Sequence, residues 1–249
     1  MGSAIANGLL ATLLPCNCVL CGASGPALLC PGCRQQFFST AIARCPVCAN
    51  PLPSTASASP GLLHPVPCGR CQADHPAFDA TVVAADYALP VDRLVLQLKF
   101  ARQLALARLF AGLLAEAVQR TDAGACPRPA LLCPVPLGLQ RLSERGFNQA
   151  LEIARPLGKA LGIAVLARFA VRVRDTQAQS STPHGARHAN IAHAFAIPDR
   201  ALVEGRHIGL VDDVMSSGQT LQELAATLKR HGAARVTNYV FARTPPNMN

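Results

Sequence analysis

Two adjacent carboxylates followed by hydroxyl and glycine residues form the stretch of this sequence with the clearest chemistry. Apolar residues from Ile208 to Val211 predict a buried strand, and Asp212 and Asp213 follow at once. Apolar residues at helical spacing then predict a helix over 221–231. A strand, a loop and a helix in this order make half of a βαβ unit, in which ligands bind at the carboxyl ends of the strands. The connecting loop consists of Ser216, Ser217, Gly218, Gln219 and Thr220.

This loop has the properties of a phosphate cradle. Gly218 allows backbone N–H groups to approach an anion closely, and the helix that follows contributes unpaired N–H groups and the positive end of its dipole. The carboxylates of Asp212 and Asp213 would repel a phosphate, but they suit sugar hydroxyls or Mg²⁺. A ribose 5-phosphate has a phosphate group for the loop and hydroxyl groups for the two carboxylates. The alternative is a solvated carboxylate pair followed by a helix-capping serine, which the complete pattern makes less attractive.

Four Cys-x-x-Cys pairs in the first third of the chain predict metal binding. A gap of two residues lets both thiolates of a pair reach one tetrahedral ion, so four pairs predict two closed structural Cys₄ zinc sites. We expect the first two pairs to share one ion and the last two the other, because residues 22–29 form a short loop; interleaved pairing is the alternative. Disulfides would need an oxidising compartment. The predicted ligands are Cys18, Cys21, Cys30, Cys33, Cys45, Cys48, Cys68 and Cys71.

Length and composition indicate a globular protein with one larger and one small domain. The chain has 249 residues and a formal charge of +9, which two zinc sites with eight thiolates would lower to roughly +5. No apolar run is long enough to span a membrane. We expect residues 1–15 to form a short amphipathic helix, because no basic residue precedes their apolar run as in a signal peptide. A cytoplasmic location with reduced thiols is expected.

The order of elements predicts a zinc-binding module over 16–76, a main domain over 77–243 and a loose tail over 244–249. Residues 51–67 are rich in proline, serine and alanine and are expected to form a flexible insertion. Lys99 lies on the polar side of a predicted helix over 91–119 and is expected to be solvated. A second helix is expected over 148–161. Strands are expected at Thr81–Tyr87, 131–137, Val165–Val173 and Arg235–Arg243.

A second anion-binding element follows the predicted strand at 131–137. Pro134 and Val135 lead into a turn, and Arg141 and Arg145 come after it. Arginines beside a strand end bind anions well, whereas the alternative is an exposed basic turn. A long polar run over 174–185 is typical of a mobile loop that closes over a site.

The stretch from Ile208 to Thr220 resembles the 5-phosphoribosyl 1-pyrophosphate (PRPP) motif of type I phosphoribosyltransferases, with Ser216 and Ser217 in place of two threonines. Nearly the whole chain resembles the ComF/GntX family of phosphoribosyltransferase-like proteins. The resemblance implies an α/β fold with a parallel sheet flanked by helices, preceded by a double zinc ribbon. It rests on the cysteine pairs, Leu98-Lys99-Phe100, Pro134-Val135-Pro136-Leu137, Arg145-Gly146-Phe147-Asn148-Gln149, Thr176 with Gln179, Arg187 with Asn190, Ala194-Phe195 and Val211-Asp212-Asp213.

This resemblance implies binding of Mg²⁺ and PRPP and transfer of the phosphoribosyl group to a nitrogen acceptor that the sequence does not identify. Asp212 and Asp213 would hold the ribose hydroxyls, and 216–220 would hold the 5-phosphate. Pro134 and Val135 would form the pyrophosphate loop, with Arg145 and Arg141 neutralising the leaving group. The flexible loop would include Arg174, Thr176 and Gln179.

Two other interpretations remain open at this stage. The family is associated with DNA uptake and competence, so the chain could be a PRPP-responsive protein that binds single-stranded DNA without catalysis. Its candidate aromatic stacking residues are Phe37, Phe38 and Phe78, although packing in a core is the favoured role for each. The third interpretation is a regulator that senses PRPP. The sequence predicts no oligomeric state.

Overall fold

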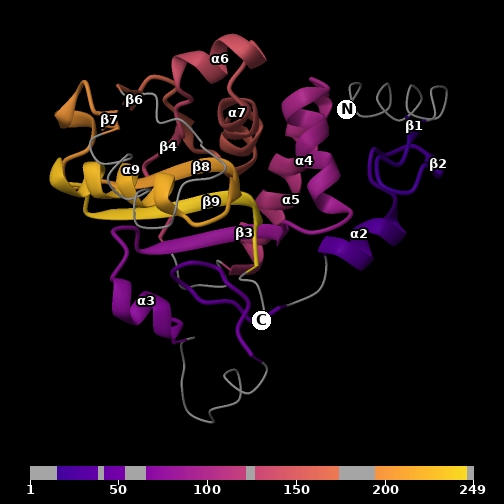
Figure 1. The fold of residues 1–249 in the computed structure, drawn as a ribbon, viewed down its shortest axis with the longest axis horizontal. Helices are drawn as coiled ribbons and strands as arrows, with labels where there is room; N and C mark the ends of the chain where they lie inside the picture. Colours follow the sequence, from indigo (N-terminus) through magenta and orange to yellow (C-terminus); the bar gives the residue numbers. More distant parts are fainter. Residues whose placement is uncertain (1–15, 39–41, 54–65, 122–126, 174–193, 246–249) are drawn as a thin grey trace.

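A parallel sheet forms the centre of the computed structural model, which describes residues 16–38, 42–53, 66–121, 127–173 and 194–245. Five strands lie in the order β3-β9-β8-β4-β5, and every neighbouring pair is parallel (Figure 1). This sheet confirms the predicted α/β class. The strands are β3 (Ala80–Asp86), β4 (Leu131–Pro134), β5 (Ala164–Val165), β8 (His207–Met215) and β9 (Arg235–Arg243).

The central strands β8 and β9 are almost fully buried because helices cover both faces of the sheet, as in other parallel sheets. On one face Phe110 of α5 (Ala105–Thr121) stacks on Phe241 of β9, with ring centroids 3.6 Å apart. Helix α7 (Gln149–Leu161) packs on α5 and on the sheet at the same face. On the other face α9 (Gln219–Arg230) buries Leu221, Leu224 and Leu228.

Several predicted elements agree closely with the structure. Strand β9 has the predicted bounds, and α7 begins one residue after Asn148, whose side chain accepts hydrogen bonds from Ala150 N and Leu151 N. Strand β8 is longer than the apolar run and ends at Met215, so that Asp212 and Asp213 lie within it. The two carboxylates therefore occupy fixed positions on a strand whose neighbours are β4 and β9.

The predicted continuous helix over 91–119 is wrong. The structure has α4 (Val91–Phe100) and α5, separated by a turn in which Arg102 adopts φ 54°. A non-glycine residue in this left-handed region cannot continue a right-handed helix. A further short helix, α6 (Leu139–Arg145), was not predicted.

The predicted strand over Val165–Val173 is also wrong as one element. Strand β5 ends at Val165, and the turn after it contains the bond from Phe169 N to Leu166 O. The chain then forms β6 (Val171–Arg172), which pairs antiparallel with β7 (Phe195–Ala196) outside the main sheet. Residues 174–193, including the predicted loop, and residues 1–15 lie outside the described part of the chain.

Two small cysteine-rich modules precede the sheet and contact it at different places (Figure 1). We call residues 16–38 the first module; it contains β1 (Cys16–Asn17), β2 (Ser24–Gly25) and α2 (Pro31–Phe38). We call residues 42–53 with 66–74 the second module; it contains α3 (Gly69–Asp74). Among the described helices, none combines the length and the apolar character needed to cross a bilayer.

Candidate functional site

The acidic pair lies at the carboxyl end of β8 and contacts a lysine from α4. Asp213 is buried, with 3% of its surface exposed, and its Oδ2 lies 2.7 Å from Lys99 Nζ. The prediction that Lys99 is solvated is wrong, since only 20% of its side chain is exposed. Burial of Leu94, Val95 and Leu98 fixes α4 against the core, which places Lys99 beside the strand end. The motif Leu98-Lys99-Phe100 was the only signal in the sequence for this contact.

The two carboxylates share one lysine, and the charge balance is therefore incomplete. Burial raises the pKa of Asp212, the negative charge of Asp213 adds to the rise, and Lys99 only partly opposes it, so that the pKa is raised to about 8. The backbone N–H of Asp213 also donates to Asp212 Oδ1 at 2.9 Å. A divalent cation would supply the missing positive charge and allow both carboxyl groups to ionise. Carboxylate oxygens are the ligands that Mg²⁺ prefers. The pair thus fits Mg²⁺ or ribose hydroxyls.

The loop after β8 has the shape that the phosphate-cradle prediction requires. Gly218 caps the N-terminus of α9 with φ 82°, and a Cβ at this position would lie 2.6 Å from Met215 Cε. Glycine is therefore needed for the backbone conformation, whereas the terminal methyl group of Met215 can move aside. The backbone N–H of Gln219 donates to Ser217 Oγ at 3.4 Å, and Thr220 follows in the first turn of the helix. Residues 216–220 thus join the end of β8 to a helix N-terminus.

The pyrophosphate-loop candidates lie on the neighbouring strand. Pro134 ends β4 and pairs with Val211, and the backbone N–H of Val135 donates to Val211 O at 2.9 Å. Asn148 Nδ2 donates to Val135 O at 3.0 Å, so the cap of α7 also holds this turn. Pro134 and Val135 therefore lie one strand away from the acidic pair, at the same carboxyl ends of the parallel strands.

A basic cavity of about 370 Å³ adjoins Lys99. It brings the predicted Arg141 and Arg145 together with Lys99 and with Arg102, which sequence reasoning missed. Arg145 lies over the ring of Phe100, with its Cζ 5.6 Å from the ring centroid. No local pattern marks Arg102, because its position depends on the break between α4 and α5. The predicted loop residues Arg174, Thr176 and Gln179 lie outside the described residues.

The first module gathers the first two cysteine pairs. The sulfur atoms of Cys18, Cys21, Cys30 and Cys33 all lie within 4.8 Å of one another, and Cys21 Sγ and Cys30 Sγ are 3.7 Å apart. A tetrahedral zinc ion with four Zn–S bonds of about 2.3 Å requires sulfur separations of about 3.8 Å. These separations are too long for disulfides. Cys16 instead donates to Gly25 O and is not in this cluster.

The second module repeats this geometry with the last two pairs. Cys45, Cys48, Cys68 and Cys71 form the second cluster, and Cys48 Sγ lies 3.7 Å from Cys68 Sγ. Sequential pairing is therefore confirmed, and interleaved pairing is excluded by the distances. Burial acts to raise the pKa of the Cys45 thiol, but hydrogen bonds from backbone N–H groups outweigh it and lower the pKa to about 7. Thiolate is the form that binds zinc, and all four positions of each cluster are cysteine, as in closed structural sites.

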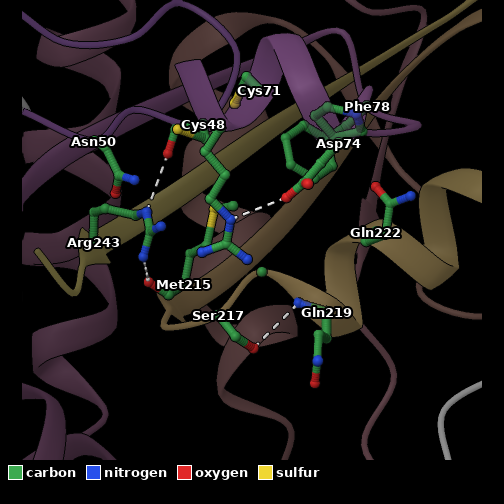
Figure 2. A pocket seen from close by; sticks show the side chains of 13 residues that line it. Cys48, Asn50, Cys71, Asp74, Phe78, Met215, Ser217, Gln219, Gln222 and Arg243 are labelled. Carbon is green, nitrogen blue, oxygen red and sulfur yellow. Dashed lines mark hydrogen bonds and ion pairs between the residues drawn. The ribbon is translucent and has the colours of Figure 1, made fainter. Parts of the chain in front are cut away.

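Arg243 connects the second module to residues 216–220, which we call the phosphate loop after their predicted role. It is 4% exposed, and its Nε donates to Cys48 O at 3.1 Å (Figure 2). Its Nη1 donates to Met215 O at 2.8 Å, to Ser216 O and to Thr244 O at 2.8 Å. The carbonyl groups come from three segments that are distant in sequence. Sequence reasoning placed Arg243 only at the end of a strand and gave it no role.

Comparison with known proteins supports both halves of this architecture. A family model described as phosphoribosyl transferase domain matches residues 142–246, and one described as double zinc ribbon domain matches residues 9–72. Both matches agree with the observed sheet and cysteine clusters.

Relatives that match most of this chain show which family it belongs to. The DNA utilization protein YhgH of Salmonella typhi is 37% identical over 87% of this chain and 97% of its own length. Competence protein F of Haemophilus influenzae is 31% identical over 86% of this chain and 90% of its own length. Among solved structures, a glutamine PRPP amidotransferase from B. subtilis covers 54% of this chain and 25% of that chain at 18% identity, with a TM-score of 0.36, too low to bear on function. With its cysteine clusters, its parallel sheet and these relatives, the chain belongs to the ComF/GntX family of phosphoribosyltransferase-like proteins with a double zinc ribbon.

Proposed function

We propose that this protein binds PRPP with Mg²⁺ and transfers the phosphoribosyl group to a nitrogen nucleophile, with release of pyrophosphate. The observation that carries the proposal is the arrangement of Asp212 and Asp213 at the end of the central strand. They lie between the cradle at Gly218 on one side and the Pro134–Val135 turn on the other. Lys99 and the basic cavity adjoin them.

Each element has a defined task in this proposal. Backbone N–H groups and hydroxyls of residues 216–220 bind the 5-phosphate, and Asp212 and Asp213 accept hydrogen bonds from the ribose hydroxyls. Mg²⁺, held by these carboxylates and the substrate, would supply positive charge to the pyrophosphate oxygens. The guanidinium groups of Arg145 and Arg141 bind the pyrophosphate as negative charge develops on it. Lys99 holds Asp213 in place.

The reaction needs little covalent chemistry from the protein. The bond from ribose C1 to the pyrophosphate oxygen breaks, the nucleophile's nitrogen forms the new bond to C1, and the nitrogen loses a proton. Positioning and charge stabilisation then account for the rate enhancement. Binding of PRPP and turnover with an acceptor have separate tests.

Calorimetric titration of the zinc-loaded protein with PRPP tests binding. We expect binding in the presence of Mg²⁺, and loss of at least about tenfold in affinity for Asp213→Asn, because a charge-assisted contact contributes about 1.5–3 kcal/mol. The matched control is Asp92→Asn, the same substitution at the start of α4. It should bind as the wild type does. Absence of PRPP binding by the wild type would contradict the proposal. Where binding is found, a screen of amines and nucleobases for pyrophosphate release tests turnover.

A second candidate function, binding of single-stranded DNA, is favoured by the basic cavity. Phe100 is 69% exposed beside Arg145, and Arg102 and Arg141 share the cavity. An exposed ring among arginines is the combination that stacks a base and contacts its phosphates. The aromatic residues expected from the sequence do not offer this surface. Phe38 and Phe78 are buried, and Phe37 packs against the core.

Fluorescence anisotropy with a labelled oligothymidine tests this second function. We expect Phe100→Ala to weaken binding about fivefold or more, since one stacked base contributes about 1–3 kcal/mol, and we expect affinity to fall with added salt. Leu89→Ala, which truncates an exposed apolar side chain just before α4, is the control and should change nothing. Equal affinity of the Phe100→Ala variant and the wild type would exclude this surface.

A further inference from the structure

A separate cavity of about 350 Å³ lies between the second module and the phosphate loop. Figure 2 shows Cys48, Asn50 and Asp74 reaching it from the second module, and Ser217 and Gln222 from the loop and from α9. The acidic pair and the residues of the basic cavity are not among the described residues that line it. The cavity is therefore separate from the acidic pair and the basic cavity, and it shares Ser217, Gly218 and Gln219 with the site proposed for PRPP.

The inner wall of this cavity is apolar. Phe78 and Met215 are 4% and 3% exposed, and Pro76 lies at the same wall. Pockets of about 300–1,000 Å³ with apolar walls and a few convergent polar groups are typical of small-molecule sites. This cavity is at the lower end of that range and accommodates a single ring system.

Asn50 supplies an acceptor that the protein itself does not use. It is 8% exposed, and its Oδ1 has no hydrogen-bond partner among the described residues. A buried polar atom without a partner costs about 1–3 kcal/mol, so a donor from a ligand would offset this cost. Gln222 provides a second polar group: its Oε1 accepts from Ala77 N at 2.8 Å, and its amide nitrogen is a donor.

The charges around the cavity disfavour an anion. Arg70 Nε lies 3.1 Å from Asp74 Oδ2, and Arg243 is already engaged with carbonyl groups. Cys48 and Cys71 line the cavity, and a Cys₄ cluster with one Zn²⁺ has a net charge of about −2. A phosphate would face this negative cluster and the carboxylate of Asp74, and Arg70, the remaining cation at the cavity, already pairs with Asp74. A neutral ligand fits better.

We propose that this cavity binds a neutral planar heterocycle of the size of a free nucleobase. The ring would lie against Phe78 and Met215, donate an N–H to Asn50 Oδ1 and accept from Gln222. Such a ligand combines apolar faces with an edge of donors and acceptors, which is what the cavity walls require. Its place beside Ser217 and Gly218 would set it next to the phosphate loop.

The test uses the zinc-loaded full chain, with free adenine, cytosine and uracil as neutral probes and nicotinate as an anionic ring of similar size. Saturation-transfer NMR and titrations measure binding. We expect at least one neutral base to bind and nicotinate not to bind. Asn50→Ala should weaken that base about tenfold, and Gln222→Glu, which keeps the oxygen that accepts from Ala77 N, should weaken it through loss of the amide donor.

Asn17→Ala is the matched control, because it makes the same truncation in the first module, where Asn17 accepts only a surface bond from Ser24. It should leave the affinity unchanged. Zinc content of two ions per chain shows that each variant is folded; if Asn50→Ala loses zinc, Gln222→Glu decides. The proposal is overturned if no neutral base binds the wild type, if nicotinate binds equally well, or if the folded variants retain full affinity. These outcomes do not depend on PRPP binding, which is measured separately.

Discussion

The two cysteine modules have the same ligand set but different relations to the rest of the molecule. The first module contacts the sheet domain through α2, where Phe38 packs near Phe241, and through the half-exposed pair of Arg34 and Glu116. The second module contacts β3 through the pair of Arg44 and Asp86 and contacts the phosphate loop through Arg243. The same set of cysteine ligands therefore occurs in one module that packs on the sheet domain through α2 and in another that contacts the candidate site.

This difference predicts that the attachment of the second module contributes far more to stability than that of the first. Arg243→Met removes the donor from the carbonyl groups of Cys48, Ser216 and Thr244, whereas Met215 O keeps its bond from the backbone N–H of Thr244. We expect a loss of about 3 kcal/mol or more in the free energy of unfolding, seen in denaturant titrations. Arg34→Met is the control at the first module and should cost less than about 1 kcal/mol, because its pair is exposed to solvent. Similar losses for both variants would remove the distinction.

Loss of one zinc site at a time gives the next largest effect. Cys48→Ser should weaken PRPP binding about tenfold, because the carbonyl of Cys48 holds Arg243, which in turn holds Met215 and Ser216. Cys21→Ser breaks the first cluster and should change PRPP affinity less than about threefold. Calorimetry after zinc quantification measures both. Equal effects of the two variants would mean that the modules act on the site alike.

The acidic pair gives a reference that does not involve either module. The pKa of Asp212 is raised to about 8, so the folded state holds a proton that the unfolded state releases near pH 4. Stability from this group is therefore full at low pH and is lost as pH rises towards 8. Asp212→Asn should raise the melting temperature at pH 9, by the equivalent of at least about 1.4 kcal/mol, the value of one pKa unit, and change it little below pH 4. A variant that is less stable than the wild type at pH 9 would contradict the raised pKa.

Local sequence patterns predicted those parts of the molecule whose geometry is set within a few residues. The spacing of Cys45 and Cys48 brings two sulfur atoms to one ion, and Asn148 caps α7 through its own side chain. Strand β8 and α9 followed from apolar spacing, and Gly218 followed from the conformation that such a loop needs. Where a prediction failed, as in the helix over 91–119, a residue with positive φ broke the element, and no propensity of Arg102 announces that conformation.

The sequence by itself determined the family, the fold class and the grouping of the cysteines, and it predicted the acidic pair with its phosphate cradle, because each depends on residue type and short spacing. Only the tertiary structure decided which cations and which module meet that site. Lys99 contacts Asp213 because the buried apolar face of α4 packs into the core, and Arg243 contacts Cys48 although the two lie 195 positions apart. Such contacts depend on how the whole chain packs. Local sequence patterns do not predict how the resulting burial changes the charge and solvation of each group.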